Sequence, residues 1–235
     1  MSPTAGRGTT RLLACGAAAG PLFLVAVLAQ DLFRPGVDPA QQPLSLLSLG
    51  DLGWIQVTAF VLTGVLFLAG AVGVRRALHP GPAGTWGPAL IAALGLGSVI
   101  AGVFPPDPAY GFPPGTAPGR AAEASWHGSL HTVGALVVFG SATALTVVFA
   151  RRSAVRRERA WVLGSLLVAA AVPVLVVLSA TDPGLTSGYL RAVAVLSWGW
   201  TSVLAARVIA PAVTTAGAAR HRGRDHEEVP RGSGC

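Results

Sequence analysis

Two histidines, His127 and His131, have the spacing that most clearly suggests chemistry in this sequence. Residues four apart lie on one face of a helix, where two imidazoles could bind the same metal ion. Asp107 precedes them in the same polar stretch and could supply a third ligand. Zinc or another divalent metal held there would activate water for hydrolysis of a lipid or an amide. The stretch lacks the glutamate of a His-Glu-x-x-His motif, which favours the alternative that both histidines hydrogen-bond loop backbone or respond to pH.

Three Asp-Pro pairs, at Asp38, Asp107 and Asp182, follow apolar stretches of the chain. Proline cannot continue a helix and aspartate readily caps or turns a chain, so each pair could simply end a helix. The alternative is an internal repeat in which the three carboxylates gather around one site. In that arrangement Asp38 or Asp182 would orient an imidazole.

Ser45, Ser48 and Arg191 are the remaining polar candidates. The serines suit turn and N-cap positions, and no nucleophile-elbow pattern supports a serine nucleophile paired with either histidine. Arg191 lies near one end of an apolar stretch, so it could extend to the lipid headgroups or pair with Asp182. No catalytic residue is assigned from these patterns.

Six apolar stretches must position these residues. The 235 residues are 52% hydrophobic and only 11% charged, far below the roughly 25% charge typical of soluble domains. At about 1.5 Å per residue, stretches of this length cross the roughly 30 Å core of a bilayer as helices. They lack the two-residue alternation of barrel strands. We therefore predict an all-α polytopic membrane bundle over residues 12–210, with six transmembrane helices arranged as three hairpins, at 12–30, 54–74, 86–104, 128–150, 161–181 and 188–210.

The basic residues predict the orientation of this bundle. All 17 are arginines, and 14 of them lie before the first stretch, in alternate connections, or from the end of the sixth stretch onward. The positive-inside rule then puts both termini in the cytoplasm of a plasma-membrane protein. This placement explains the net charge of +7 without a nucleic-acid partner. Residues 1–11 are expected to be cytoplasmic, residues 1–29 to be an uncut anchor, and residues 211–235 to be a disordered tail.

Several short runs together resemble one known family. They are Asp38-Pro39, Leu44 to Gly50, Gly53 to Gln56, Ala101 to Pro108, and His131. In combination they are similar to the domain of unknown function 998 family, over about residues 12–210. The matching positions are Ser45, Ser48, Gly53, Trp54, Phe104, Pro105, Asp107 and His131. The resemblance implies a six-helix bacterial integral membrane protein and brings no established biochemical activity.

The leading functional hypothesis is a polar site on the extracytoplasmic side that binds or handles a membrane-derived or small ligand. Its candidate residues are Asp38, Ser45, Ser48, Asp107, His127, His131, Asp182 and Arg191. The expected partners are the lipid bilayer and a lipid or small molecule. Alternatives are a metal-dependent membrane hydrolase that uses His127, His131 and Asp107, and a transporter or non-catalytic assembly partner. The apolar stretches contain no acidic residue, which disfavours a proton or sodium relay.

Overall fold

The structure is a computed structural model that describes residues 6–209 of the chain. Within this part, six helices are long and apolar enough to cross a membrane, which confirms the predicted all-helical class. They are α1 (Arg7–Phe33), α2 (Gly53–Leu78), α3 (Pro82–Val103), α4 (Trp126–Val155), α5 (Arg159–Thr181) and α6 (Thr186–Ala194). The last helix continues through the π-helical turn η2 (Val195–Gly199) to Ile209. The predicted tail at 211–235 lies outside the described residues.

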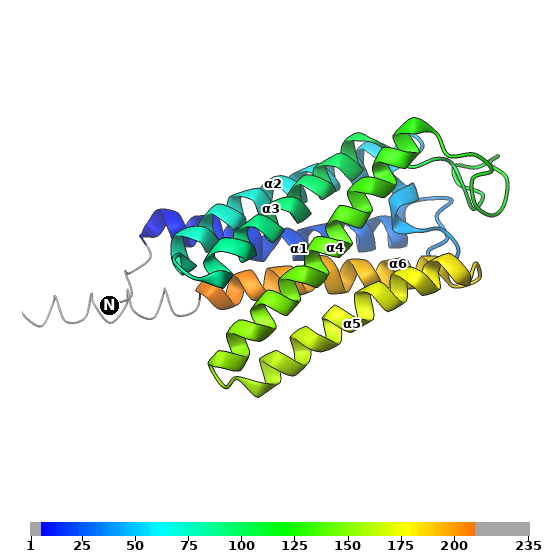
Figure 1. Cartoon of the computed structure of the whole chain (residues 1–235). Coiled ribbons are helices and arrows are strands. Elements are labelled where there is room, and N and C mark those ends of the chain that lie inside the picture. The colour runs from blue at the N-terminus through cyan, green and yellow to red at the C-terminus, as the bar shows by residue number, and fades with distance from the viewer. Residues whose placement is uncertain (1–5, 210–235) are drawn as a thin grey trace, which may run out of the picture.

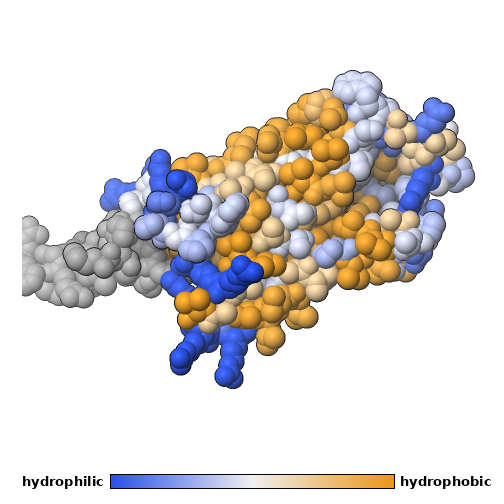
Figure 2. Space-filling model, viewed as in Figure 1, coloured by the Kyte–Doolittle hydropathy of each residue, from blue (hydrophilic) through white to orange (hydrophobic). Residues whose placement is uncertain are grey.

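Helices that follow one another along the chain pack side by side, and η2 returns to α1 and α4 (Figure 1). The helix surfaces form an apolar band between hydrophilic ends (Figure 2). We call the end with the long connections 34–52 and 104–125 the loop end. The opposite end, with the short connections 79–81 and 156–158, is the arginine end. The candidate residues named above all belong to the loop end.

Glycines let α3 pack tightly against both of its neighbours. A Cβ atom added at Gly64 of α2 would lie 2.5 Å from the carbonyl oxygen of Gly95, and one added at Gly97 would lie 2.7 Å from that of Gly134 on α4. Backbones that approach this closely are typical of helix pairs in lipid, where small residues replace bulky ones at the contact. By contrast, α4 and α5 meet at the arginine end and diverge toward the loop end (Figure 1). The space between these two helices is where the candidate site lies.

Trp198 of η2 lies at the centre of the bundle and contacts residues of α1, α2, α3 and α4. Its ring stacks on Phe23 of α1 with centroids 4.4 Å apart, and it lies 6.1 Å from Phe60 of α2 and 6.3 Å from Phe139 of α4. Its indole N–H donates to the hydroxyl of Ser98 on α3 at 3.2 Å. A buried tryptophan usually satisfies its N–H in this way. The side chain is therefore fixed in place at the centre of the bundle.

Candidate functional site

A cavity of about 430 Å³ opens at the loop end, among α4, α5 and α6. Its volume falls in the range of sites that bind small molecules, roughly 300–1,000 Å³. Polar side chains line it near the connections: Ser45, Asp107, Tyr110, Arg120, His131, Thr132, Ser179 and Thr186. Apolar side chains line it farther along the helices, and they include Phe60, Val138, Phe139, Ala194 and Trp198. The polar lining is thus confined to the loop end, where apolar residues such as Leu44 and Ala109 lie beside it, and the deeper lining is apolar.

His131 is held against the end of α3. Its Nδ1 lies 2.9 Å from the carbonyl oxygen of Ala101 and 3.0 Å from that of Phe104. The carbonyl of Ala101 would ordinarily accept from the N–H four residues later, but that residue is Pro105 and has none. Because carbonyls only accept, Nδ1 must carry the proton. In the neutral ring the other nitrogen, Nε2, is then an acceptor.

His127 occupies the same helix face one turn earlier, as the spacing predicts. Its Nδ1 lies 3.1 Å from the carbonyl oxygen of Pro105. The two histidines of α4 therefore supply donors to three carbonyls at the end of α3, which has no N–H groups of its own left to satisfy them. His131 is 7% exposed and lines the cavity, whereas His127 is half-buried and does not.

Asp107 lies against the start of α4. Its carboxylate accepts from the N–H of Ser125 at 3.0 Å, and Ser125 in turn caps the helix by accepting from the N–H of Gly128. A Cβ atom at Gly128 would collide with the Asp107 carboxylate, so glycine is what permits this close approach. Hydrogen bonding to the Ser125 hydroxyl is the largest cause that lowers the pKa of Asp107, and partial burial opposes it. The carboxylate is therefore charged at neutral pH, at the helix end where a negative charge is favourable.

A row of rings joins the polar end of the cavity to its apolar floor. The ring of Phe60 lies 6.1 Å from that of His131 in an edge-on arrangement, and 6.1 Å from that of Trp198 on the other side. Along α4, the lining extends from Gly128 to Phe139, which is about 16 Å at 1.5 Å per residue. A bound molecule would therefore meet polar groups at one end and aromatic carbon at the other.

The cavity also opens sideways, between α4 and α5. Thr132 and Leu136 of α4 and Ala180 of α5 all line it, and all three are exposed on the surface of the bundle. Leu136 is 54% exposed. All three residues lie within the membrane-spanning helices, so this side of the cavity borders the region where lipid chains would lie. A hydrophobic molecule could enter without passing through water.

The connection 104–125 reaches across the divergence between α4 and α5. Arg120 donates to the carbonyl oxygens of Ser179 at 2.9 Å and Ala180 at 2.8 Å, at the end of α5. Its Nε donates to the hydroxyl of Tyr110 at 3.2 Å. Tyr110 and Gly111 both have positive φ, at 51° and 71°, as in a tight type I′ turn. The connection is thereby tied down over the loop end of the cavity.

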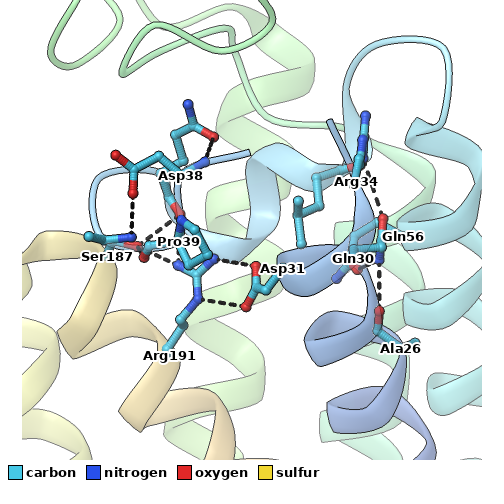
Figure 3. A network of polar contacts seen from close by, with 12 residues as sticks. Ala26, Gln30, Asp31, Arg34, Asp38, Pro39, Gln56, Ser187 and Arg191 are labelled. Carbon is cyan, nitrogen blue, oxygen red and sulfur yellow. Dashed lines mark hydrogen bonds and ion pairs between the residues drawn. The ribbon is translucent and has the colours of Figure 1, made fainter. Parts of the chain in front are cut away.

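Arg191 pairs with Asp31, and the predicted pairing with Asp182 is wrong. Its guanidinium contacts both carboxylate oxygens of Asp31, at 2.8 and 3.1 Å (Figure 3). It also donates to the carbonyl oxygen of Gln42 at 2.7 Å and to the hydroxyl of Ser187. The helix α1 extends to Phe33, so Asp31 lies in its last turn, opposite Arg191 on α6. This bidentate pair fastens α1, α6 and the connection 34–52 together.

A second polar group joins α1 to α2 beside this pair. Gln30 donates to the side-chain oxygen of Gln56 at 2.7 Å, and Arg34 donates to that of Gln30 at 3.3 Å (Figure 3). Arg34 also donates to the carbonyl oxygens of Leu47, at 2.5 Å, and Leu49. These carbonyls end the short helix η1 (Leu44–Ser48). The segment that carries Ser45 is thus held at the cavity by an arginine.

Three of the predicted site residues, Ser45, Asp107 and His131, come together at the cavity. Asp38 forms a local turn through the N–H of Ala40 at 2.9 Å, and Asp182 forms a similar turn through the N–H of Gly184 at 3.1 Å. In both cases aspartate acts as the turn residue that the simpler interpretation of Asp-Pro predicts. Asp38, Ser48, His127, Asp182 and Arg191 are not part of the cavity lining.

The predicted metal ligands do not form a three-ligand group. Among residues 6–209, no three side chains of His, Cys, Asp or Glu are grouped so that they could hold a metal ion. The Nδ1 atoms of His127 and His131 face carbonyls of α3, and Asp107 faces Ser125. A metal-dependent hydrolase stays a prediction from the sequence.

Several lining residues were not predicted as site residues from the sequence, notably Arg120, Tyr110 and Thr186. One signal could have found Arg120. The positive-inside count leaves only Arg34, Arg120 and Arg191 on the side opposite the other arginines. All three bind backbone carbonyls at the loop end. A charge that departs from the topological rule is therefore a good indicator of a specific contact.

Comparison with known proteins identifies a family. A family model described as "Protein of unknown function (DUF998)" matches residues 17–207. This range covers most of α1, all of α2 to α6, and every lining residue of the cavity. No curated protein and no solved structure matches the chain.

Proposed function

The chain belongs to the DUF998 family of proteins of unknown function, and we propose that it binds a membrane-derived amphiphile in the cavity at its loop end. The hydrocarbon part of the ligand lies between α4, α5 and α6, against Phe60, Phe139 and Trp198. The head group lies beside Ser45, Asp107 and His131.

The observation that carries this proposal is the polarity gradient of the cavity. A soluble metabolite would leave the aromatic floor uncovered, and a wholly apolar molecule would offer no partner to Nε2 of His131 or to the carboxylate oxygen of Asp107 that does not accept from the Ser125 N–H. Burying a polar group without a hydrogen bond costs on the order of 1–3 kcal/mol. An amphiphile satisfies both ends at once, and the lateral opening between α4 and α5 gives it a route from the bilayer.

We further propose that the loop end faces the extracytoplasmic side of the plasma membrane. The support is the distribution of arginines, of which 14 belong to the opposite side. The ligand would then come from the outer leaflet or from outside the cell.

Replacing Ala135 with phenylalanine tests the proposed binding. Ala135 lines the cavity from α4, and a phenyl ring there would occupy the space meant for the ligand chain. We expect at least about a tenfold loss of affinity for 1-oleoylglycerol, since tenfold corresponds to only about 1.4 kcal/mol of lost contacts. The measurement is native mass spectrometry of the solubilised full chain with the lipid titrated in.

Val133→Phe is the matched control. Val133 lies on the same helix, is 50% exposed and does not line the cavity, so its replacement should leave binding unchanged. Equal affinities for the parent chain, Ala135→Phe and Val133→Phe would contradict the proposal. The melting temperatures of both variants would show that the fold is intact.

A further inference from the structure

The polar end of the cavity presents mainly hydrogen-bond acceptors. The hydroxyl of Thr132 donates to the carbonyl oxygen of Gly128 at 3.0 Å. The hydroxyl of Thr186 donates to the carbonyl oxygen of Ser179 at 3.0 Å. Both hydroxyls have therefore used their hydrogen, and only their lone pairs face the cavity. The ionised carboxylate of Asp107 has no hydrogen to offer, and the neutral ring of His131 offers Nε2.

The donors at this end are mostly engaged. Arg120 uses Nε and Nη2 on Tyr110 and on the two carbonyls at the end of α5. The Ser179 hydroxyl donates to the carbonyl oxygen of Val176 at 2.7 Å. Nη1 of Arg120 and the hydroxyls of Ser45 and Tyr110 are the donors that remain among the lining side chains. Five lining side chains therefore offer acceptors to a ligand, and three offer donors.

The charges at the mouth of the cavity balance. Asp107 carries a negative charge on the α4 side, and Arg120 carries a positive charge on the α5 side. A phosphate or carboxylate head group would be attracted by one and repelled by the other, and so would an ammonium group. Neither sign of head-group charge gains a net advantage, and hydrogen bonding decides the preference.

Building on the proposed function, we infer that the ligand is a lipid with an uncharged, hydroxyl-bearing head group, such as glycerol or a sugar. Its hydroxyls donate to the Asp107 carboxylate and to Nε2 of His131. Its chain passes Phe60 toward Trp198. The site selects this head group because a polyol donates several hydrogen bonds and brings no charge.

The test compares four lipids that share one chain: 1-oleoylglycerol, methyl oleate, oleoyl lysophosphatidic acid and oleylamine. Each is titrated into the solubilised full chain and followed by native mass spectrometry. We expect oleoylglycerol to bind about tenfold or more tighter than the other three, the ratio that two ordinary hydrogen bonds supply. Asp107→Asn keeps the shape of the side chain but replaces one acceptor oxygen with a donor, so it should bring the ratio of oleoylglycerol to methyl oleate toward one.

Asp38→Asn is the matched control, because Asp38 belongs to the same end of the bundle but not to the cavity lining. Asparagine forms the same turn, so the ratio should stay at its parent value. Binding of methyl oleate reports in each variant that the apolar part of the cavity is intact.

The outcomes separate this inference from the proposed function. Equal binding of oleoylglycerol and methyl oleate would overturn the head-group inference and leave the proposed function standing. Tightest binding of lysophosphatidic acid, lost in Arg120→Gln, would identify an anion site instead. Tightest binding of oleylamine would likewise overturn the choice of an uncharged head group. Failure of all four lipids to bind would overturn both proposals.

Discussion

Replacing His131 with alanine is expected to destabilise the bundle by about 2–4 kcal/mol and to abolish ligand binding. The substitution leaves the carbonyls of Ala101 and Phe104 without their donor, and each buried acceptor left unpaired costs roughly 1–3 kcal/mol. Because residue 105 is proline, no backbone N–H can replace the imidazole as donor to the carbonyl oxygen of Ala101. The measurement is the free energy of unfolding in mixed micelles, together with the affinity for oleoylglycerol.

Two further variants separate the roles of the two ring nitrogens. In His131→Asn the amide nitrogen takes the position of Nδ1, so the carbonyls of α3 stay bonded while the acceptor at Nε2 is lost. In His131→Gln the amide reaches the position of Nε2, and the donor at Nδ1 is lost. We expect the asparagine variant to keep most of the stability and lose affinity, and the glutamine variant to lose stability. If both variants changed stability and affinity in parallel, the assignment of separate roles would be wrong.

Replacing Arg191 with methionine is expected to lower the free energy of unfolding by about 2–4 kcal/mol. The side chain of Asp31 is 11% exposed, and removing one partner of a buried ion pair typically costs 3–5 kcal/mol because the other charge stays buried. Partial solvent screening reduces this figure. The substitution also removes the hydrogen bonds that Arg191 donates to the carbonyl oxygen of Gln42 and to the hydroxyl of Ser187. Unfolding in mixed micelles again provides the measurement.

A double-mutant cycle shows whether the loss comes from the pair. Asp31→Asn combined with Arg191→Met should cost less than the two single changes added together, with a coupling energy above about 1 kcal/mol. Arg76→Met is the control, because Arg76 is exposed at the arginine end and such surface changes stay within about 0.5 kcal/mol. Additive effects of Asp31→Asn and Arg191→Met would mean that the contact contributes nothing of its own.

The sequence predicts the helices well because the bilayer imposes strong conditions on them. A segment that crosses the hydrocarbon must be long, apolar and internally hydrogen-bonded, and these properties are local. The shared face of His127 and His131 is local too, since it follows from 3.6 residues per turn. The sequence alone therefore predicts Asp107 and His131 as residues of one site.

The partners of these residues depend on how helices meet, which a local pattern does not contain. The spacing of the histidines is compatible with a metal site and with hydrogen bonds to loop backbone. Their hydrogen bonds to carbonyls depend on α3 ending beside α4 and on Pro105, which removes a backbone donor. In the same way, Arg191 has an acidic residue nearer in sequence at Asp182, yet the bundle brings it to Asp31 across 160 positions.

No sequence pattern distinguishes the aromatic residues at the floor of the cavity. Phe60, Phe139 and Trp198 belong to three apolar segments in which any large side chain would suit a bilayer. The π-helical turn η2 sets the position of Trp198, and such turns have no clear sequence signature, although they often occur at functional sites.

We propose that the ligand's lipid chain reaches the centre of the bundle. The most direct measurement is photocrosslinking in vesicles with a 1-acylglycerol that carries a diazirine at the chain terminus, followed by peptide mapping of the full chain. We expect labelling concentrated at Val138 and Phe139 of α4, at Ala194 of α6 and at residues 195–198 of η2, and its loss in Ala135→Phe. Labelling spread over the lipid-exposed side chains of α5, such as Leu167 and Val174, with none at residues 194–198, would contradict it.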